Sequence, residues 1–75
     1  MNKMKEYREK FGYSQRDIAT MMNLSQGQYW KLETGKSLLN ANQIFQLCKI
    51  YNCTPNDILG IQGVHTVVIH SIDSM

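Results

Sequence analysis

The sequence predicts an all-α fold of five short helices, followed by a short C-terminal β-strand. Side chains able to cap a helix recur at short intervals, and apolar residues follow them at a spacing of three or four. After Gly60 the residue types change to the β-branched ones that favour strands. Because 75 residues can bury only one modest core, we expect one helical domain over residues 1–60 and a tail over residues 61–75.

The first two helices are expected before residue 23. Asn2 opens the first helix and Gly12 ends it, and the apolar positions at helical spacing between them are Met4, Tyr7 and Phe11. Ser14 caps the second helix, and Asp17 stands at its third helical position. The residues expected on the inner face of this helix are Ile18, Ala19 and Met22.

A sharp turn is expected at Asn23, because Asn tolerates the left-handed backbone conformation better than any residue except Gly. The third helix follows at once, since Ser25 to Gln28 has the form of a capping box. Its buried stripe is expected from Tyr29 and Leu32. Gly35 ends it, so the second and third helices form a closely joined pair.

Two more helices and one strand complete the prediction. Asn40 to Gln43 repeats the capping pattern, and the apolar face that follows consists of Ile44, Leu47, Cys48 and Tyr51. Thr54 is a cap with Pro55 at the first helical position, which opens a helix of one turn. Residues 64–69 read as an extended strand, and a single strand needs a partner.

Two short helices joined by a tight turn match the helix-turn-helix plan. The residues that carry the match run from Arg8 through Ser14-Gln15-Arg16-Asp17-Ile18-Ala19 and Leu24-Ser25 to Leu32-Glu33-Thr34-Gly35-Lys36. This run resembles the phage repressor and Cro family of helix-turn-helix regulators, also called the xenobiotic response element family. The resemblance extends from Met4 to Leu59 and implies a five-helix, lambda-repressor-like DNA-binding domain. It further implies a Cro-like repressor that binds a palindromic operator in double-stranded DNA as a dimer.

The resemblance also implies which residues meet DNA. Gln15 would bond a phosphate and brace Gln26, and the Gln26 amide could donate to and accept from an adenine edge in the major groove. Gly27 would let the backbone approach DNA closely, while Lys31 would face a guanine or a phosphate. The residues expected at DNA are Gln15, Arg16, Ser25, Gln26, Gly27, Gln28, Trp30, Lys31, Thr34, Lys36, Ser37 and Asn40.

In that family the Arg of the first helix often pairs with the Glu that ends the recognition helix, which implies an inward ion pair between Arg8 and Glu33. Such a pair is structural and costly to break from one side. The sequence departs from the family pattern where Asn23 replaces Gly, where Leu39 replaces Pro and where Tyr29 replaces Ile or Val. A large aromatic residue such as Trp30 is also unusual on a DNA-reading surface.

The basic residues are concentrated in the first half of the chain, which indicates that the two ends have different roles. The formal net charge is only +2, but six of the eight basic residues precede residue 35 and the last twenty-five residues contain none.

A DNA-binding protein of this kind usually places two recognition helices about 34 Å apart, so two copies of the chain must be joined. We expect the tail to join them by antiparallel strand pairing through Val64, Thr66, Val67, Val68 and Ile69. The alternatives are that the strand packs back on its own domain or that the tail is disordered.

Other functions fit less well. An antitoxin that represses its own operon, and an adaptor that binds only proteins, stay as alternatives. The spacing of Cys48, Cys53, His65 and His70 approaches that of a zinc finger, but the cysteines would flank a helix end, so we expect no metal. No Gly-rich phosphate loop or nucleophile elbow occurs, so we expect no catalytic residue and no cofactor. A chain of this size has no room for a separate ligand-binding domain, so we expect no small-molecule ligand. The polar N-terminus and the lack of a long apolar run predict a cytoplasmic protein without a membrane segment.

Overall fold

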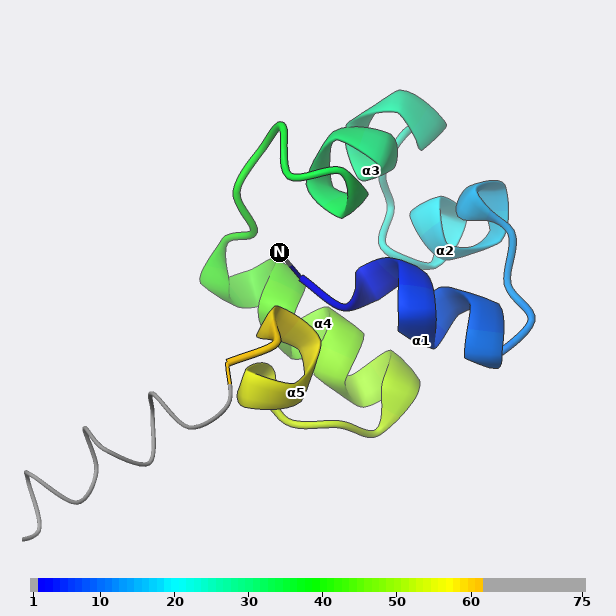
Figure 1. Ribbon diagram of the computed structural model, residues 1–75. Helices are drawn as coiled ribbons and strands as arrows, with labels where there is room; N and C mark the ends of the chain where they lie inside the picture. The colour runs from blue at the N-terminus through cyan, green and yellow to red at the C-terminus, as the bar shows by residue number, and fades with distance from the viewer. Residues whose placement is uncertain (1, 62–75) are drawn as a thin grey trace, which may run out of the picture.

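The computed structural model describes residues 2–61, and these residues form five helices and no strand. The helices are α1 (Met4–Lys10), α2 (Gln15–Met21), α3 (Gln26–Glu33), α4 (Ala41–Tyr51) and α5 (Pro55–Leu59) (Figure 1). Helix α2 packs on α3, α4 packs on α5, and α1 contacts α5. The all-α domain expected from the sequence is therefore present, whereas the strand predicted over residues 64–69 lies outside the described residues.

Four of the five helices begin with a complete capping box. In each box the side-chain oxygen of the cap residue accepts a hydrogen bond from the backbone N–H three residues later, and that later side chain accepts from the cap N–H. The pairs are Ser14 with Asp17, Ser25 with Gln28, Asn40 with Gln43, and Thr54 with Asp57. Because each box satisfies two otherwise unpaired amides, the local sequence fixes where these helices start.

Helix α1 begins differently, with its start held by contacts to other helices. The Asn2 side-chain oxygen accepts from the Met4 N–H at 3.1 Å, while its Nδ2 donates to the carbonyl of Leu32 at 2.9 Å. The Lys3 N–H donates to the carbonyl of Ile58 at 2.7 Å. Two consecutive residues thus tie the start of α1 to the end of α3 and to α5.

Each of the four turns between helices contains a residue with positive φ, and the first of them is Gly12, with φ of 76° between α1 and α2. Asn23 has φ of 58° between α2 and α3, and Gly35 has φ of 83° after α3, as the sequence predicted for both. Asn52 also adopts the left-handed conformation, with φ of 53°, and it ends α4. No left-handed residue was predicted at Asn52 from the sequence, although Asn at the end of an apolar helical pattern is a typical signal for one.

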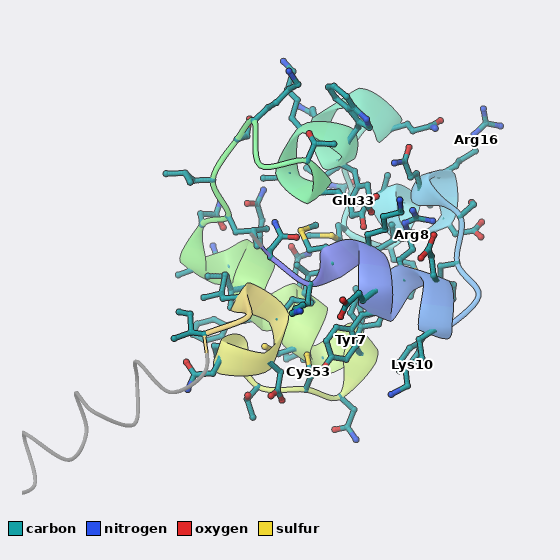
Figure 2. All side chains as sticks on the ribbon, viewed as in Figure 1. Tyr7, Arg8, Lys10, Arg16, Glu33 and Cys53 are labelled. Carbon is teal, nitrogen blue, oxygen red and sulfur yellow. The ribbon has the colours of Figure 1, made fainter. Side chains whose placement is uncertain are left out.

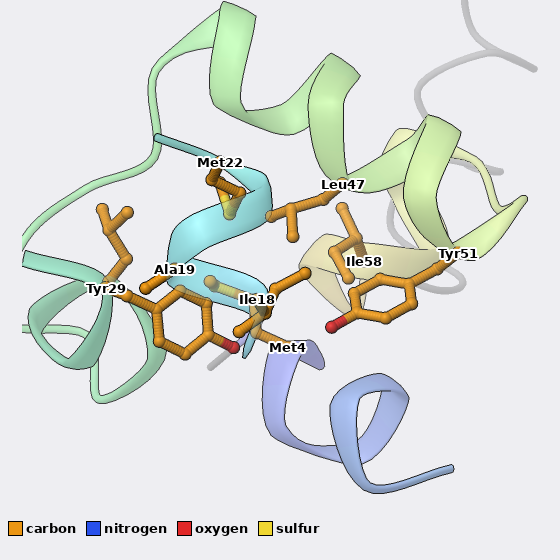
Figure 3. Packing of buried hydrophobic residues seen from close by; sticks show 9 residues of the cluster. Met4, Ile18, Ala19, Met22, Tyr29, Leu47, Tyr51 and Ile58 are labelled. Carbon is orange, nitrogen blue, oxygen red and sulfur yellow. The ribbon is translucent and has the colours of Figure 1, made fainter. Parts of the chain in front are cut away.

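One apolar core lies between the helices and draws on all five of them (Figure 3). Its buried members are Met4, Ile18, Ala19, Met22, Tyr29, Leu32, Leu47, Tyr51 and Ile58. All the residues predicted for the inner faces of α2 and α3 are among these buried members. Phe11 differs, because it follows the end of α1 and is 42% exposed. Its ring meets the Tyr51 ring edge-on, with 5.0 Å between the centroids.

Candidate nucleic-acid interface

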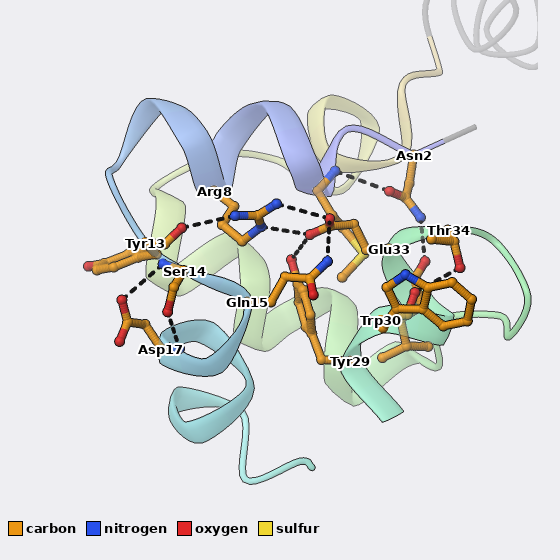
Figure 4. Close-up of polar contacts among 12 residues, drawn as sticks. Asn2, Arg8, Tyr13, Ser14, Gln15, Asp17, Tyr29, Trp30, Glu33 and Thr34 are labelled. Atoms are coloured by element: carbon orange, nitrogen blue, oxygen red, sulfur yellow. Dashed lines mark hydrogen bonds and ion pairs between the residues drawn. The ribbon is translucent and has the colours of Figure 1, made fainter. Parts of the chain in front are cut away.

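Glu33, the last residue of α3, is the polar centre of the domain (Figure 4). Its side chain is only 5% exposed and forms a two-point ion pair with Arg8, whose Nε and Nη2 donate to the two carboxylate oxygens at 2.8 and 3.1 Å. Tyr29 donates its hydroxyl to the same carboxylate at 2.5 Å, and Gln15 donates its Nε2 at 3.3 Å. Four hydrogen bonds from α1, α2 and α3 therefore converge on one carboxylate, and we call this group the Glu33 network.

The protonation of the Glu33 network follows from these contacts. Burial alone raises the pKa of Glu33, but the hydrogen bonds from Arg8, Tyr29 and Gln15 together outweigh it and hold the pKa below its usual value. The pKa of Tyr29 is raised, first by burial and then by its hydrogen bond to Glu33. At neutral pH the carboxylate is thus ionised and the phenol is protonated, which is the state that the donors and acceptors require.

Tyr29 and Gln15 each make a contact to Glu33 that was not predicted from the sequence. The position of Tyr29 was expected to contribute only to the core, and the contact of its hydroxyl was missed. Gln15 was assigned to a DNA phosphate and to Gln26, whereas its Nε2 here donates to Glu33. The spacing of Tyr29 and Glu33 by four helical positions is the signal that could have indicated their contact.

Two Tyr→Phe substitutions distinguish the contributions that the two buried tyrosine hydroxyls make to stability. The Tyr51 hydroxyl is buried, has no hydrogen-bond partner among residues 2–61, and has a pKa raised to about 12 by burial. We expect Tyr51→Phe to raise the free energy of unfolding by about 1 kcal/mol, because it removes an unpaired buried polar group. We expect Tyr29→Phe to lower it by about 1 to 3 kcal/mol, since Glu33 loses a donor.

Urea unfolding of the parent and both variants measures the difference in the free energy of unfolding. The comparison requires that the slope of this free energy against urea concentration is the same for all three proteins. Each variant is the control for the other, because both lose one phenol oxygen from a buried ring. Equal effects of the two changes would mean that the Tyr29 hydroxyl contributes nothing through Glu33.

The side of α3 opposite the core is exposed and polar. Tyr29, Leu32 and Glu33 are its buried residues, so the remaining positions at helical spacing face outward. We call this surface the outer face of α3, and its residues are Gln26, Gly27, Trp30, Lys31 and Thr34. All five are exposed in the structure, and Trp30 is 41% exposed.

The loop after α3 folds back toward this outer face. The Lys36 ammonium lies over the Trp30 ring, 5.5 Å from its centroid, which is within range for a cation–π contact. The Ser37 N–H donates to the carbonyl of Lys31 at 3.0 Å. The Thr34 hydroxyl donates to the carbonyl of Trp30 at 2.8 Å. These contacts place exposed Lys36 and Ser37 beside the exposed residues of α3.

The other residues assigned to DNA lie at helix starts. Ser25 and Gln28 form the cap of α3, so the side-chain oxygen of each already accepts a hydrogen bond there. Asn40 caps α4 and is exposed. Arg16 lies in the first turn of α2, and Figure 2 shows its side chain extending away from the body of the domain.

The charge balance of this surface is positive. Between Ser25 and Asn40 the sequence has one acidic residue, Glu33, and Arg8 pairs with it. Lys31 and Lys36 are exposed in the same segment. A surface with exposed cations and a paired carboxylate attracts a polyanion such as the phosphate backbone of DNA.

The two cysteines belong to α4 and to the turn between α4 and α5, not to the outer face of α3. Cys48 and Cys53 are free and half-buried, and burial is the main cause that raises the pKa of Cys53 to about 11. No cluster of three or more metal-ligating side chains occurs within residues 2–61, and His65 and His70 lie outside that range.

None of the five helices combines the length and the apolar character that a bilayer crossing requires.

Two capped helices joined by a tight turn, with a buried inner face and an exposed, positively charged outer face on the second, define a helix-turn-helix domain. A family model described as helix-turn-helix matches residues 4–58, so the chain belongs to this family of DNA-binding regulators of the Cro and C1 type. No curated protein and no solved structure matches the chain significantly.

Proposed function

We propose that the chain is a Cro-like transcriptional repressor that binds a palindromic operator as a homodimer. Helix α3 is the recognition helix, and its outer face enters the major groove. Arg16, Lys36, Ser37 and Asn40 contact phosphates on either side of that groove. A protein of this kind represses by binding alone, because an occupied operator overlapping a promoter excludes the polymerase.

The observation that carries the proposal is the position of Gly27 inside α3. Gly favours a helix less than Ala does, so its presence in the first turn of α3 calls for a reason. A Cβ built at Gly27 would meet no atom within 4 Å, so packing within the described chain does not require Gly there. A Gly on the exposed side of a recognition helix instead permits close contact between its backbone and DNA. The neighbouring Gln26 and Lys31 then supply the groups that distinguish bases.

The dimer in this proposal is supported by the sequence of the tail. Strand pairing through Val64, Thr66, Val67, Val68 and Ile69 would join two domains about a two-fold axis. Two recognition helices would then face successive major grooves on one side of the duplex. A palindromic operator is the sequence that such a symmetric pair reads.

Selection of bound sites from a random DNA pool tests the proposal directly. The selected sites should contain two inverted half-sites whose centres lie about 34 Å apart, which is one helical turn. Single half-sites without inversion would contradict the dimer, and the absence of any enriched sequence would contradict base reading by α3.

On the selected operator, Gly27→Ala is expected to weaken binding while leaving the domain folded. The new methyl group has free space within the protein but would occupy the space that DNA needs. Thermal unfolding should show a melting temperature equal to or above that of the parent, since Ala favours helix more than Gly. Unchanged operator affinity would show that the backbone at Gly27 does not approach DNA.

Lys36→Ala is expected to weaken binding to the operator and to random DNA alike. If the ammonium neutralises one phosphate, the slope of log K against log salt falls by about one unit. Filter binding or fluorescence anisotropy at several salt concentrations measures the slope. Lys49→Ala is the matched control, because Lys49 lies in the last turn of α4, a helix that contributes no residue to the outer face of α3. An unchanged slope for Lys36→Ala would remove Lys36 from the interface.

A further inference from the structure

A groove of about 540 Å³ lies on the surface between the α3–α4 loop, α4 and α5. Its apolar lining consists of Leu38, Leu39, Ile44, Leu59 and Ile61, and none of its lining residues carries a charge. Leu38 is 92% exposed, although it adjoins the other apolar side chains of the groove. A group of neighbouring apolar side chains that are exposed together is typical of a surface that another segment covers.

The groove lies where the described part of the chain ends. Ile61, the last described residue, is part of its lining, and fourteen residues follow in the sequence. Among these are Val64, Val67, Val68 and Ile69, and none of the fourteen is Lys or Arg. The apolar composition of this segment therefore matches that of the groove.

The connection is short enough to make this segment the favoured occupant. Val64 follows Ile61 by three residues, a distance of at most about 11 Å along an extended chain. A tether of this length gives the segment an effective concentration on the order of millimolar, far above that of most free partners. We propose that the groove holds residues 64–69 of the same chain, with their apolar side chains against Leu38, Leu39 and Ile61.

This occupancy is compatible with the proposed dimer but does not depend on DNA binding. A strand that lies with one face in the groove keeps a backbone edge free for a second strand. A pair of strands alone is only marginally stable in water, and packing against helices supplies the cover that it needs. The groove would thus give the paired tails their apolar support.

A thermodynamic cycle in the full-length chain tests the proposal. The variants are Leu38→Ser, Val67→Ser with Val68→Ser, and all three changes together. Val67 and Val68 fall on opposite faces of a strand, so changing both affects whichever face meets the groove. We expect Leu38→Ser alone to lower the melting temperature by about 4 to 8 °C. When the tail already carries its two substitutions, Leu38→Ser should lower it no further.

A melting temperature for Leu38→Ser within 1 °C of the parent would overturn the proposal, because that is the behaviour of a side chain that nothing covers. Additive effects of the loop and tail substitutions would also overturn it. If the coupling disappears at protein concentrations at which the chain sediments as a monomer, the occupant comes from a second copy and the assignment to the same chain is wrong. Phe45→Ser is the matched control, since Phe45 is 58% exposed but lies outside the groove, and it should show no coupling to the tail.

Discussion

Replacing Glu33 with alanine is expected to lower the free energy of unfolding by about 3 to 5 kcal/mol. The substitution leaves the guanidinium of Arg8, a residue whose side chain is only 12% exposed, without its carboxylate partner. It also leaves the hydroxyl of Tyr29 and the amide of Gln15 without their acceptor. For a domain this small the loss approaches the whole free energy of unfolding. Chemical unfolding of the purified variant, followed by circular dichroism, measures it.

Glu9→Ala is the matched control for this prediction. Glu9 is an exposed residue of α1, and surface substitutions of this kind usually change stability by less than about 0.5 kcal/mol. A Glu33→Ala variant as stable as Glu9→Ala would mean that the Glu33 network contributes nothing to folding. Arg8→Ala should resemble Glu33→Ala, because it leaves the opposite charge unpaired in the same place.

The pH dependence of stability provides a second readout of the same network. The folded-state pKa of Glu33 lies below its ordinary value of 4.5, so the folded state favours the ionised carboxylate. The stabilisation is therefore complete above that ordinary value and is lost as the pH falls through the lower, folded-state pKa. The melting temperatures of the parent and of Glu33→Gln should differ at neutral pH and converge in acid. A difference that stays constant down to the lowest pH would contradict this linkage.

Gln26→Ala is expected to weaken binding to the operator by about 1 to 3 kcal/mol, a factor of roughly 5 to 150. Binding to random DNA should change little, because contacts to base edges specify the sequence whereas phosphate contacts only position the protein. Gln26 is the first residue of α3 and is exposed, so its removal does not disturb the core. Titration of the variant against both DNAs gives the two affinities.

Gln46→Ala is the control, since Gln46 is an exposed glutamine on α4. It should leave both affinities unchanged. Equal loss of affinity by Gln26→Ala on the operator and on random DNA would place Gln26 at a phosphate rather than at a base.

The starts of the helices could be predicted from the sequence because the interactions that fix them are local. Each capping box joins residues three positions apart, so Ser14, Ser25 and Asn40 indicate α2, α3 and α4 without knowledge of the tertiary fold. The start of α1 is different. Asn2 was identified as the signal that precedes α1, but its bond to the carbonyl of Leu32 spans thirty positions and depends on how α1 and α3 pack.

The polar network shows the limit of prediction from sequence more clearly. Resemblance to the family indicated Arg8 and Glu33, and the structure places them in contact. It gave no indication that Tyr29, in a position usually held by an aliphatic residue, would donate to the same carboxylate. That contact requires α3 to present one side chain to the core and to the ion pair at once. The bases that we propose the outer face to read could not be predicted for a related reason, because they depend on a DNA partner that the sequence does not encode.

The position of Trp30 has a practical consequence for spectroscopy. It is the one tryptophan in the sequence, and it lies on the outer face of α3 with Lys36 above its ring. Two of the four tyrosines, Tyr29 and Tyr51, are buried in the core instead. Indole emission therefore responds mainly to whatever covers the outer face, while the tyrosine signal responds to loss of the core. The unmodified chain thus carries two intrinsic optical probes, one that reports occupancy and another that reports unfolding.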